Sequence, residues 1–170
     1  AHAGDLDLGV GAERVLEPLL AQVLDEGIER ADDPDLGAAA HLSVRLDPAA
    51  GPPTFEAVLE DQVVGDVDRL AAAVRNQYRA EATREQQAAQ QPLPVTPGQL
   101  VGWRTDGDLR AGAVTVHLAV QAPAGPRSDY AVPLRWIGGD WSVDAAESGP
   151  FFPVTALSGQ YRTFAAGEAL

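Results

Sequence analysis

The chain has 170 residues and a formal net charge of −13, with 25 acidic residues against 12 basic ones. All of the basic residues are arginines. So acidic a chain lacks the broad positive surface that neutralises phosphates, and we therefore expect no nucleic-acid partner and no adsorption to an anionic membrane. The sequence contains no cysteine, which excludes disulfides, thiol catalysis and cysteine-ligated zinc. An alanine-rich, lysine-free composition is typical of a high-GC bacterial genome.

The length fits one domain with a substantial core. Residues 1–10 show no apolar period and are expected to form a disordered lead-in. We place a single domain at residues 11–148 and a C-terminal extension at residues 149–170, where apolar side chains recur without a regular period. No run approaches the roughly 20 apolar residues that span a bilayer, so any membrane anchor is expected upstream of this sequence.

Helical periods dominate the first half of the chain. Apolar residues recur every three or four positions over residues 11–30 and again over residues 54–90, which predicts two amphipathic helices. Gly65 and Asp66 offer a point at which the second helix divides, with Asp66 as the N-cap of its later part. Between the helices, residues 41–47 alternate between apolar and polar side chains and predict a short strand.

The second half has the alternation of β-strands. Strands are predicted at residues 99–105 and 111–121, with Asp106-Gly107-Asp108 as a turn between them. Residues 129–146 predict a hairpin closed by Gly138-Gly139-Asp140, and Pro133 indicates a sheet edge or a bulge. Helices that cover one face of such strands give an α+β fold with a curved antiparallel sheet of about four strands. The expected core side chains of the sheet are Trp103, Val116, Leu118, Val132, Leu134, Trp136, Trp141 and Val143.

Helices followed by a four-strand meander that ends in W-x-x-G-D-W-x-V resemble nuclear transport factor 2-like (NTF2-like, cystatin-like) domains. More narrowly, the chain resembles the extracytoplasmic domain of the inner-membrane assembly component of conjugative type IV secretion systems in Gram-positive mobile elements. The matching segments are Gly102-Trp103, residues 113–120, residues 132–136, residues 139–143 and Leu157-Ser158-Gly159-x-Tyr161. The resemblance implies a domain held outside the cytoplasmic membrane by an N-terminal transmembrane helix.

The resemblance further implies a non-catalytic scaffold without a cofactor, which associates with itself and with other channel subunits. Its contacts are expected at the end of the second helix and in the C-terminal tail. The apolar stripe of that helix serves either the core, which we favour, or a partner helix. The tail either crosses a neighbouring subunit or returns to its own sheet. The candidate interface residues are Arg75, Tyr78, Arg79, Arg84, Phe151, Phe152, Leu157 and Tyr161.

A second interpretation makes the domain an NTF2-like enzyme or ligand-binding protein. Enzymes of this fold hold an Asp–His or Tyr–Asp pair in a cavity between helices and sheet. If the strands pair in register, His117 lies beside Asp129, Asp106 or Tyr130, and such a pair serves general base catalysis once burial tunes it. The three histidines are too scattered to predict a metal site. We favour the non-enzymatic interpretation.

Overall fold

The computed structural model describes residues 34–95, 99–123, 125–145 and 154–163. The predicted lead-in at residues 1–10, the predicted helix at residues 11–30, Phe151 and Phe152 lie outside this part of the chain. The helical elements are α3 (Pro34–Leu46), η2 (Pro48–Ala50), α4 (Pro52–Asp61), α5 (Val67–Glu81), α6 (Arg84–Ala89) and η3 (Leu109–Ala111). The strands are β1 (Val63–Gly65), β2 (Gln99–Asp108), β3 (Ala113–Gln121), β4 (Arg127–Ile137), β5 (Asp140–Ala145), β6 (Val154–Ala156) and β7 (Arg162–Thr163).

The described residues form an α+β fold built on one sheet of seven strands, rather than the predicted four. The predicted meander is confirmed, because β2, β3, β4 and β5 are antiparallel neighbours in chain order. Three short strands extend it. β1 pairs with β5 in parallel, β6 pairs with the start of β4, and β7 pairs with β2. The sheet is therefore mixed, and most of its pairs are antiparallel.

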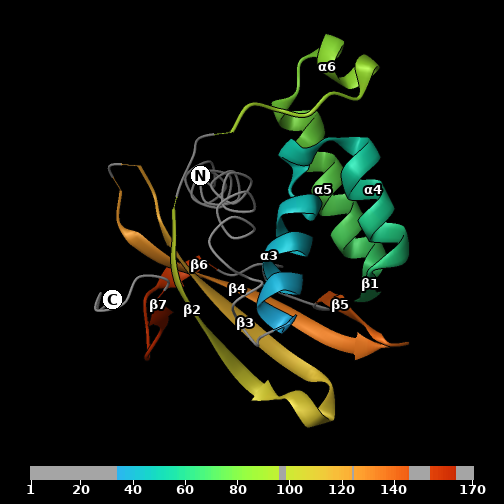
Figure 1. Ribbon diagram of the computed structural model, residues 1–170. Coiled ribbons are helices and arrows are strands. Elements are labelled where there is room, and N and C mark those ends of the chain that lie inside the picture. The colour runs from blue at the N-terminus through green and yellow to red at the C-terminus, as the bar shows by residue number, and fades with distance from the viewer. Residues whose placement is uncertain (1–33, 96–98, 124, 146–153, 164–170) are drawn as a thin grey trace.

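Helices α3, α4 and α5 lie together on one face of the sheet, while α6 projects away from it (Figure 1). α3 packs directly on β3, β4 and β5. The alternation of β3 explains this contact, because its even-numbered apolar residues from Val114 to Val120 are buried. Seven of the eight predicted core side chains of the sheet are buried beneath the helices or beside them.

Trp136 is the exception, and its predicted place in the core is wrong. Its side chain is 49% exposed, whereas its cross-strand partner Trp141 is 6% exposed. The two rings meet edge to face, with centroids 5.2 Å apart and an interplanar angle of 74°. Trp136 follows the phase of the core residues, but the end of β4 runs past the area that the helices cover.

The strand predicted at residues 41–47 is also wrong, because residues 41–46 belong to α3 and Asp47 is the N-cap of η2. Side chains are buried around most of this helix, including Leu42, Ser43 and Val44 in succession. A helix buried on so many sides has no clear polar stripe, so the helical period is not visible in its sequence. Apolar and polar residues at 41–47 then alternate as they would in a strand. The hydroxyl of Ser43 donates to the Ala40 carbonyl oxygen at 3.1 Å, which satisfies it inside the core.

The long segment at residues 54–90 divides at Asp66, which confirms the division predicted at Gly65 and Asp66. The Asp66 carboxylate accepts a hydrogen bond from the Arg69 backbone N–H at 3.2 Å and caps α5. Val63, however, lies in β1 and not in a helix. A second break comes at Thr83, whose hydroxyl and backbone form a capping box with Gln86 at the start of α6.

The connections of the sheet also differ from expectation at one point. Asp106-Gly107-Asp108 is not a turn, because β2 continues through these residues and η3 makes the turn instead. The predicted hairpin turn is confirmed, with φ of 62° at Gly138 and 87° at Gly139, as a type I′ turn requires. Pro133 lies between the part of β4 that pairs with β6 and the part that pairs with β5. Within the described residues, the edge of β4 that pairs with β6 and β5 is therefore unpaired at Pro133, and a proline is tolerated there.

The two tryptophans should respond differently to truncation. We expect Trp141→Ala to lower the free energy of unfolding by about 3–5 kcal/mol, as for other buried tryptophans. Trp136→Ala removes a half-exposed side chain and one aromatic contact, and should cost less than about 1.5 kcal/mol. Urea unfolding followed by far-ultraviolet circular dichroism measures both. Equal losses would contradict the exposed position of Trp136.

Candidate functional site

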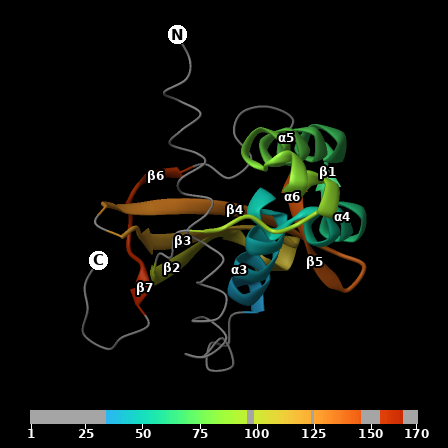
Figure 2. The same ribbon diagram turned by 90° about the horizontal axis from the view of Figure 1, so that it is seen from above.

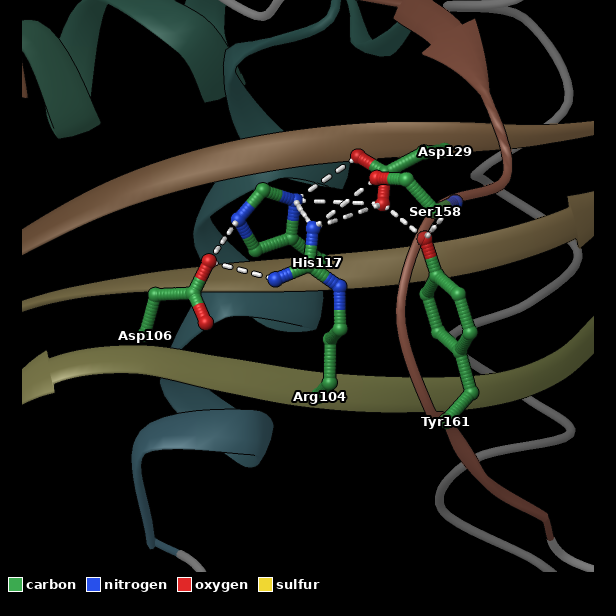
Figure 3. A network of polar contacts seen from close by, with 6 residues as sticks. All are labelled: Arg104, Asp106, His117, Asp129, Ser158 and Tyr161. Atoms are coloured by element: carbon green, nitrogen blue, oxygen red, sulfur yellow. Dashed lines mark hydrogen bonds and ion pairs between the residues drawn. The ribbon is translucent and has the colours of Figure 1, made fainter.

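A cluster of polar side chains lies on the face of the sheet opposite to α3. Val116 and Leu118 of β3 point into the helical layer, so His117 between them points the other way. Figure 3 shows the helix behind the strands and the cluster in front of them. Among the described residues, six side chains make up this polar cluster: Arg104, Asp106, His117, Asp129, Ser158 and Tyr161.

His117 is at the centre of the polar cluster. Its Nδ1 lies 2.8 Å from Oδ1 of Asp129, and its Nε2 lies 3.0 Å from Oδ2 of Asp106. Strand register produces this arrangement. Asp106 pairs with Thr115, two residues before His117, and Asp129 pairs with Ala119, two residues after it. A neutral imidazole donates to one of these carboxylates, and an imidazolium donates to both.

Arg104 is directly opposite His117 on β2 and joins the remaining side chains. Its guanidinium forms an ion pair with Asp106 and lies 3.8 Å from Oδ2 of Asp129. Its Cζ lies 5.4 Å from the centroid of the Tyr161 ring, which is a cation–π geometry. Burial opposes the charge of this guanidinium, but the neighbouring Tyr161 and Asp106 outweigh it, so the pKa of Arg104 is raised.

Asp129 is the most enclosed member of the polar cluster, with 2% of its surface exposed. Its Oδ2 accepts a short hydrogen bond from the Tyr161 hydroxyl, and both of its oxygens lie near His117 Nδ1. A carboxylate out of contact with water is tolerated only when charged or donating groups surround it. His117, Arg104 and Tyr161 supply those groups.

Tyr161 reaches the cluster from a segment that we call the strap, residues 154–163. The strap begins as β6 beside residues 128–130 of β4 and ends as β7 beside Gly102-Trp103 of β2. Between these strands it crosses the sheet from β4 to β2, at one end of β4, β3 and β2 (Figure 2). Within the described residues 154–163, the tail therefore returns to its own sheet, which is one of the two courses predicted for it.

The L-S-G-x-Y motif of the strap brings Ser158 and Tyr161 to the polar cluster and places Gly159 beside Arg104. Ser158 Oγ lies 3.4 Å from Nη2 of Arg104, and the Ser158 backbone N–H donates to the Tyr161 hydroxyl at 3.2 Å. Gly159 has φ of 85°, and a Cβ placed there would lie 3.4 Å from Nε of Arg104. That distance is an ordinary van der Waals contact, so glycine is favoured at this position by its backbone conformation.

The structure brings together only part of the predicted catalytic set. His117 and Asp129 are in contact, and Asp106 joins them, as the register implied. Tyr130 is on the opposite face, buried in the helical layer opposite Leu118. The expected place of the site is also wrong, since His117 faces the strap and not a space between helices and sheet. Sequence reasoning missed Arg104 and Ser158, although the register of β2 and the L-S-G-x-Y motif both carried signals for them.

The predicted interface residues on α5 and α6 have separate surroundings. Arg75 pairs with Glu56 of α4 through two contacts of 2.6 and 2.7 Å, and hydrogen bonding to Arg75 lowers the pKa of Glu56. Arg79 and Arg84 are exposed. Leu157, in the strap, is half-buried.

Tyr78 is not a surface residue, which corrects its predicted role. Its ring is buried and packs edge-on against Phe55, with centroids 5.8 Å apart. Its hydroxyl lies 3.0 Å from the carbonyl oxygen of Gln86 and 2.8 Å from that of Gln91. Tyr78 therefore holds α6 against the end of α5 from within the fold, and its ring is not available to a partner.

Within the described ranges, no group of three or more His, Asp and Glu side chains is arranged to hold a metal ion. In the polar cluster, His117 separates the two carboxylates, so its three potential ligands do not converge on one point. The arrangement instead forms a chain of donors and acceptors that joins β2, β3, β4 and the strap.

The model of a protein family described as "Domain of unknown function (DUF8175)" matches residues 36–162. The chain belongs to this family. The match begins within α3 and ends in β7, so the DUF8175 region includes the helices, the sheet and the strap. No curated protein and no solved structure matches the chain.

The bond between Tyr161 and Asp129 should contribute measurably to stability. Tyr161→Phe removes the hydroxyl and leaves a buried carboxylate short of one donor, so we expect a loss of about 1–3 kcal/mol in the free energy of unfolding. Urea titrations of Tyr161→Phe, Asp129→Asn and the double variant give the coupling between the two side chains. A direct contact predicts coupling of about 0.5–3 kcal/mol, whereas additive losses would argue against it.

Asp106 should make the free energy of unfolding depend on pH. Hydrogen bonding to Arg104 lowers the pKa of Asp106 in the folded chain. A lowered pKa stabilises the fold fully above the unfolded value of about 4, and this stabilisation disappears as the pH falls through the lowered folded value. Asp106→Asn should therefore be less stable than the parent at pH 7, and the difference should vanish at low pH. Asp61→Asn, an exposed control, should show no such loss at pH 7.

Proposed function

We propose that this DUF8175 domain is a non-catalytic, extracytoplasmic scaffold of a bacterial conjugation or type IV secretion channel. It acts through contacts with other channel subunits or with further copies of itself. The resemblance of its strand and strap motifs to the inner-membrane assembly component of such channels motivates the proposal. The strand motifs lie in β2, β3, β4 and the β4–β5 hairpin of the described sheet, and L-S-G-x-Y lies between β6 and β7, in contact with Arg104 of β2.

The observation that carries the non-catalytic part of the proposal is the saturation of His117. Both ring nitrogens already face carboxylates of the same chain, at 2.8 and 3.0 Å. A general base needs a free nitrogen within hydrogen-bond reach of the substrate proton. Asp129, the other candidate, is almost fully enclosed by His117, Arg104 and Tyr161. The cluster has the features of a structural link between strands and strap.

Exposed apolar side chains support a function in protein contact. Leu109, Trp136 and Ile137 are 56%, 49% and 45% exposed, respectively. They lie at one end of the sheet, because the Trp136 backbone N–H donates to Gly112, whose own N–H donates to Leu109. Large exposed apolar groups gathered in this way are typical of surfaces that bind other proteins. We assign this end of the sheet to a neighbouring channel subunit.

No helix in the described part of the chain is both long enough and apolar enough to span a bilayer. The proposal places the membrane anchor upstream of residue 1, as the resemblance implies. The acidic charge of the domain agrees with contacts to protein rather than to phosphates or anionic lipid headgroups.

A second candidate function is that of a small-molecule enzyme or ligand-binding protein. The contact of 2.8 Å between His117 and Asp129 favours it, since such pairs serve as general bases in many enzymes. In that case a substrate would have to displace the strap or Asp106 to reach the imidazole. The enzyme hypothesis makes function depend on His117, whereas the scaffold hypothesis makes it depend on the exposed end of the sheet.

DNA transfer between cells tests the proposal. In the native strain, in-frame deletion of the coding region should reduce the mating frequency by at least about tenfold, and the unaltered gene should restore it. The double variant Trp136→Ser and Ile137→Ser should fail to restore transfer while the domain accumulates normally. Arg127→Ser, at the opposite end of β4, provides a matched surface control and should restore transfer.

Unchanged mating after the deletion would overturn the proposed function. Full restoration by the Trp136→Ser and Ile137→Ser variant, with loss of function in His117→Gln, would instead favour the enzyme. Both variants should be compared at equal cellular abundance, so that lower stability is not mistaken for loss of contact.

A further inference from the structure

The strap is held to the sheet by short strand ladders and has no buried residue of its own. It contacts the sheet through a three-residue ladder at β6 and a two-residue ladder at β7. None of the residues 154–163 is buried, although the strap covers a buried carboxylate. Segments with few buried apolar contacts open at a small fraction of the global unfolding free energy. The strap is therefore expected to separate from the sheet more easily than the strands of the meander separate from one another.

The site under the strap recognises side chains and not only backbone. Asp129 accepts from a tyrosine hydroxyl, Arg104 faces the tyrosine ring, and Gly159 passes beside Arg104 with positive φ. The edges of β4 and β2 each accept one end of the segment as a strand. This combination of strand addition and side-chain anchors is a common mode of peptide recognition. The acceptor site thus contacts the serine, glycine and tyrosine of the Ser-Gly-x-Tyr segment.

We propose that this acceptor site also binds the strap of a second copy of the same chain. The second copy's strap would replace the resident one, so that each Tyr161 binds the Asp129 of its neighbour. The contacts are identical in the two arrangements, because the segment and the site are the same. The inference deepens the proposed scaffold function by naming its self-association contact, and it rests on that function for its cellular setting.

The balance between the two arrangements depends on concentration. A resident segment competes at an effective concentration of the order of millimolar. At about 0.1 mM chain, exchange should therefore occupy roughly one site in ten, and covalent trapping would accumulate this fraction. Opening the site returns Asp129 and Arg104 to water, so the exchange does not leave a buried charge without a partner. Copies held side by side in a channel would raise the fraction exchanged.

The absence of cysteine in the chain allows a direct test by disulfide trapping. Ser128 of β4 and Ala156 of β6 are strand partners, and antiparallel partners are close enough for a disulfide bond. One full-length chain carries Ser128→Cys and the other carries Ala156→Cys with a mass tag. Mixed and oxidised, they should give a disulfide-linked heterodimer, and the fraction of chains trapped per unit time should fall about tenfold when both chains are diluted tenfold. Asp140→Cys replaces Ser128→Cys in the control for random collision.

Tyr161→Phe makes the test directional. Placed in the chain with Ser128→Cys, it weakens the resident strap, so the intact strap of the other chain should be trapped several times faster. Placed in the chain with Ala156→Cys, it weakens that strap equally in its own site and in the acceptor site, so trapping should stay close to the rate of the pair that lacks Tyr161→Phe. Both mixtures contain the same substitutions, so general loss of stability affects them alike.

Equal trapping in the two directions would overturn strap exchange, as would a rate no higher than that of the Asp140→Cys control. Because these measurements use purified chains, they are independent of mating. Failure of trapping with normal dependence of mating on the domain would leave the scaffold function standing. Trapping without any effect of the domain on mating would retain the exchange and reject the scaffold function.

Discussion

The buried carboxylate of Asp129 is the group on which the arrangement of the meander and the strap depends. Its enclosure requires His117 from β3, Arg104 from β2 and Tyr161 from the strap to be present together. Those side chains reach it only if the strands of the meander have their observed register. One charged group thus ties strand pairing, strap docking and local electrostatics into a single arrangement, and a slip of one residue would send His117 to the helical face.

The same alternation gives β3 two different covers. Even-numbered side chains enter an apolar layer formed with α3, where packing contributes through the area removed from water. On the other face, His117 lies in the polar cluster beside the strap, where polar contacts replace apolar area. A sheet covered in these two ways has an extensive interior on one face and a thin, ordered polar layer on the other.

The sequence predicted the meander and its hairpin because these depend on neighbouring residues. Gly138-Gly139 specifies a turn by itself, and the alternation of β3 follows from its own side chains. The errors occurred where distant parts of the chain decide. α3 was mistaken for a strand because it is buried on most sides, and Trp136 was placed in the core because periodicity does not reveal where helical cover ends. β1 has three residues and exists through its pairing with β5, so local patterns did not reveal it.

In the candidate site, too, the contacts that follow from strand register were predictable, and those that depend on a distant segment were not. The contact of His117 with Asp129 followed from strand register alone. Arg104 was overlooked because an arginine on an expected strand usually faces solvent. The contribution of Ser158 and Tyr161 depends on a segment that returns to the sheet after β5, and local patterns carry no information on such a return. Motif resemblance had drawn attention to these two residues without indicating what they touch.

The parallel pairing of β1 with β5 has a consequence for the order in which the domain forms. Val63 lies between two helices in the first half of the chain, yet its strand partner Val143 follows the last turn of the meander. During synthesis the helical layer therefore emerges before the strand that completes its edge. Contacts between such distant residues slow folding, so the helices remain incompletely anchored until the hairpin has formed. Nascent chains that stall before β5 would expose the apolar side of α3 and become clients for chaperones.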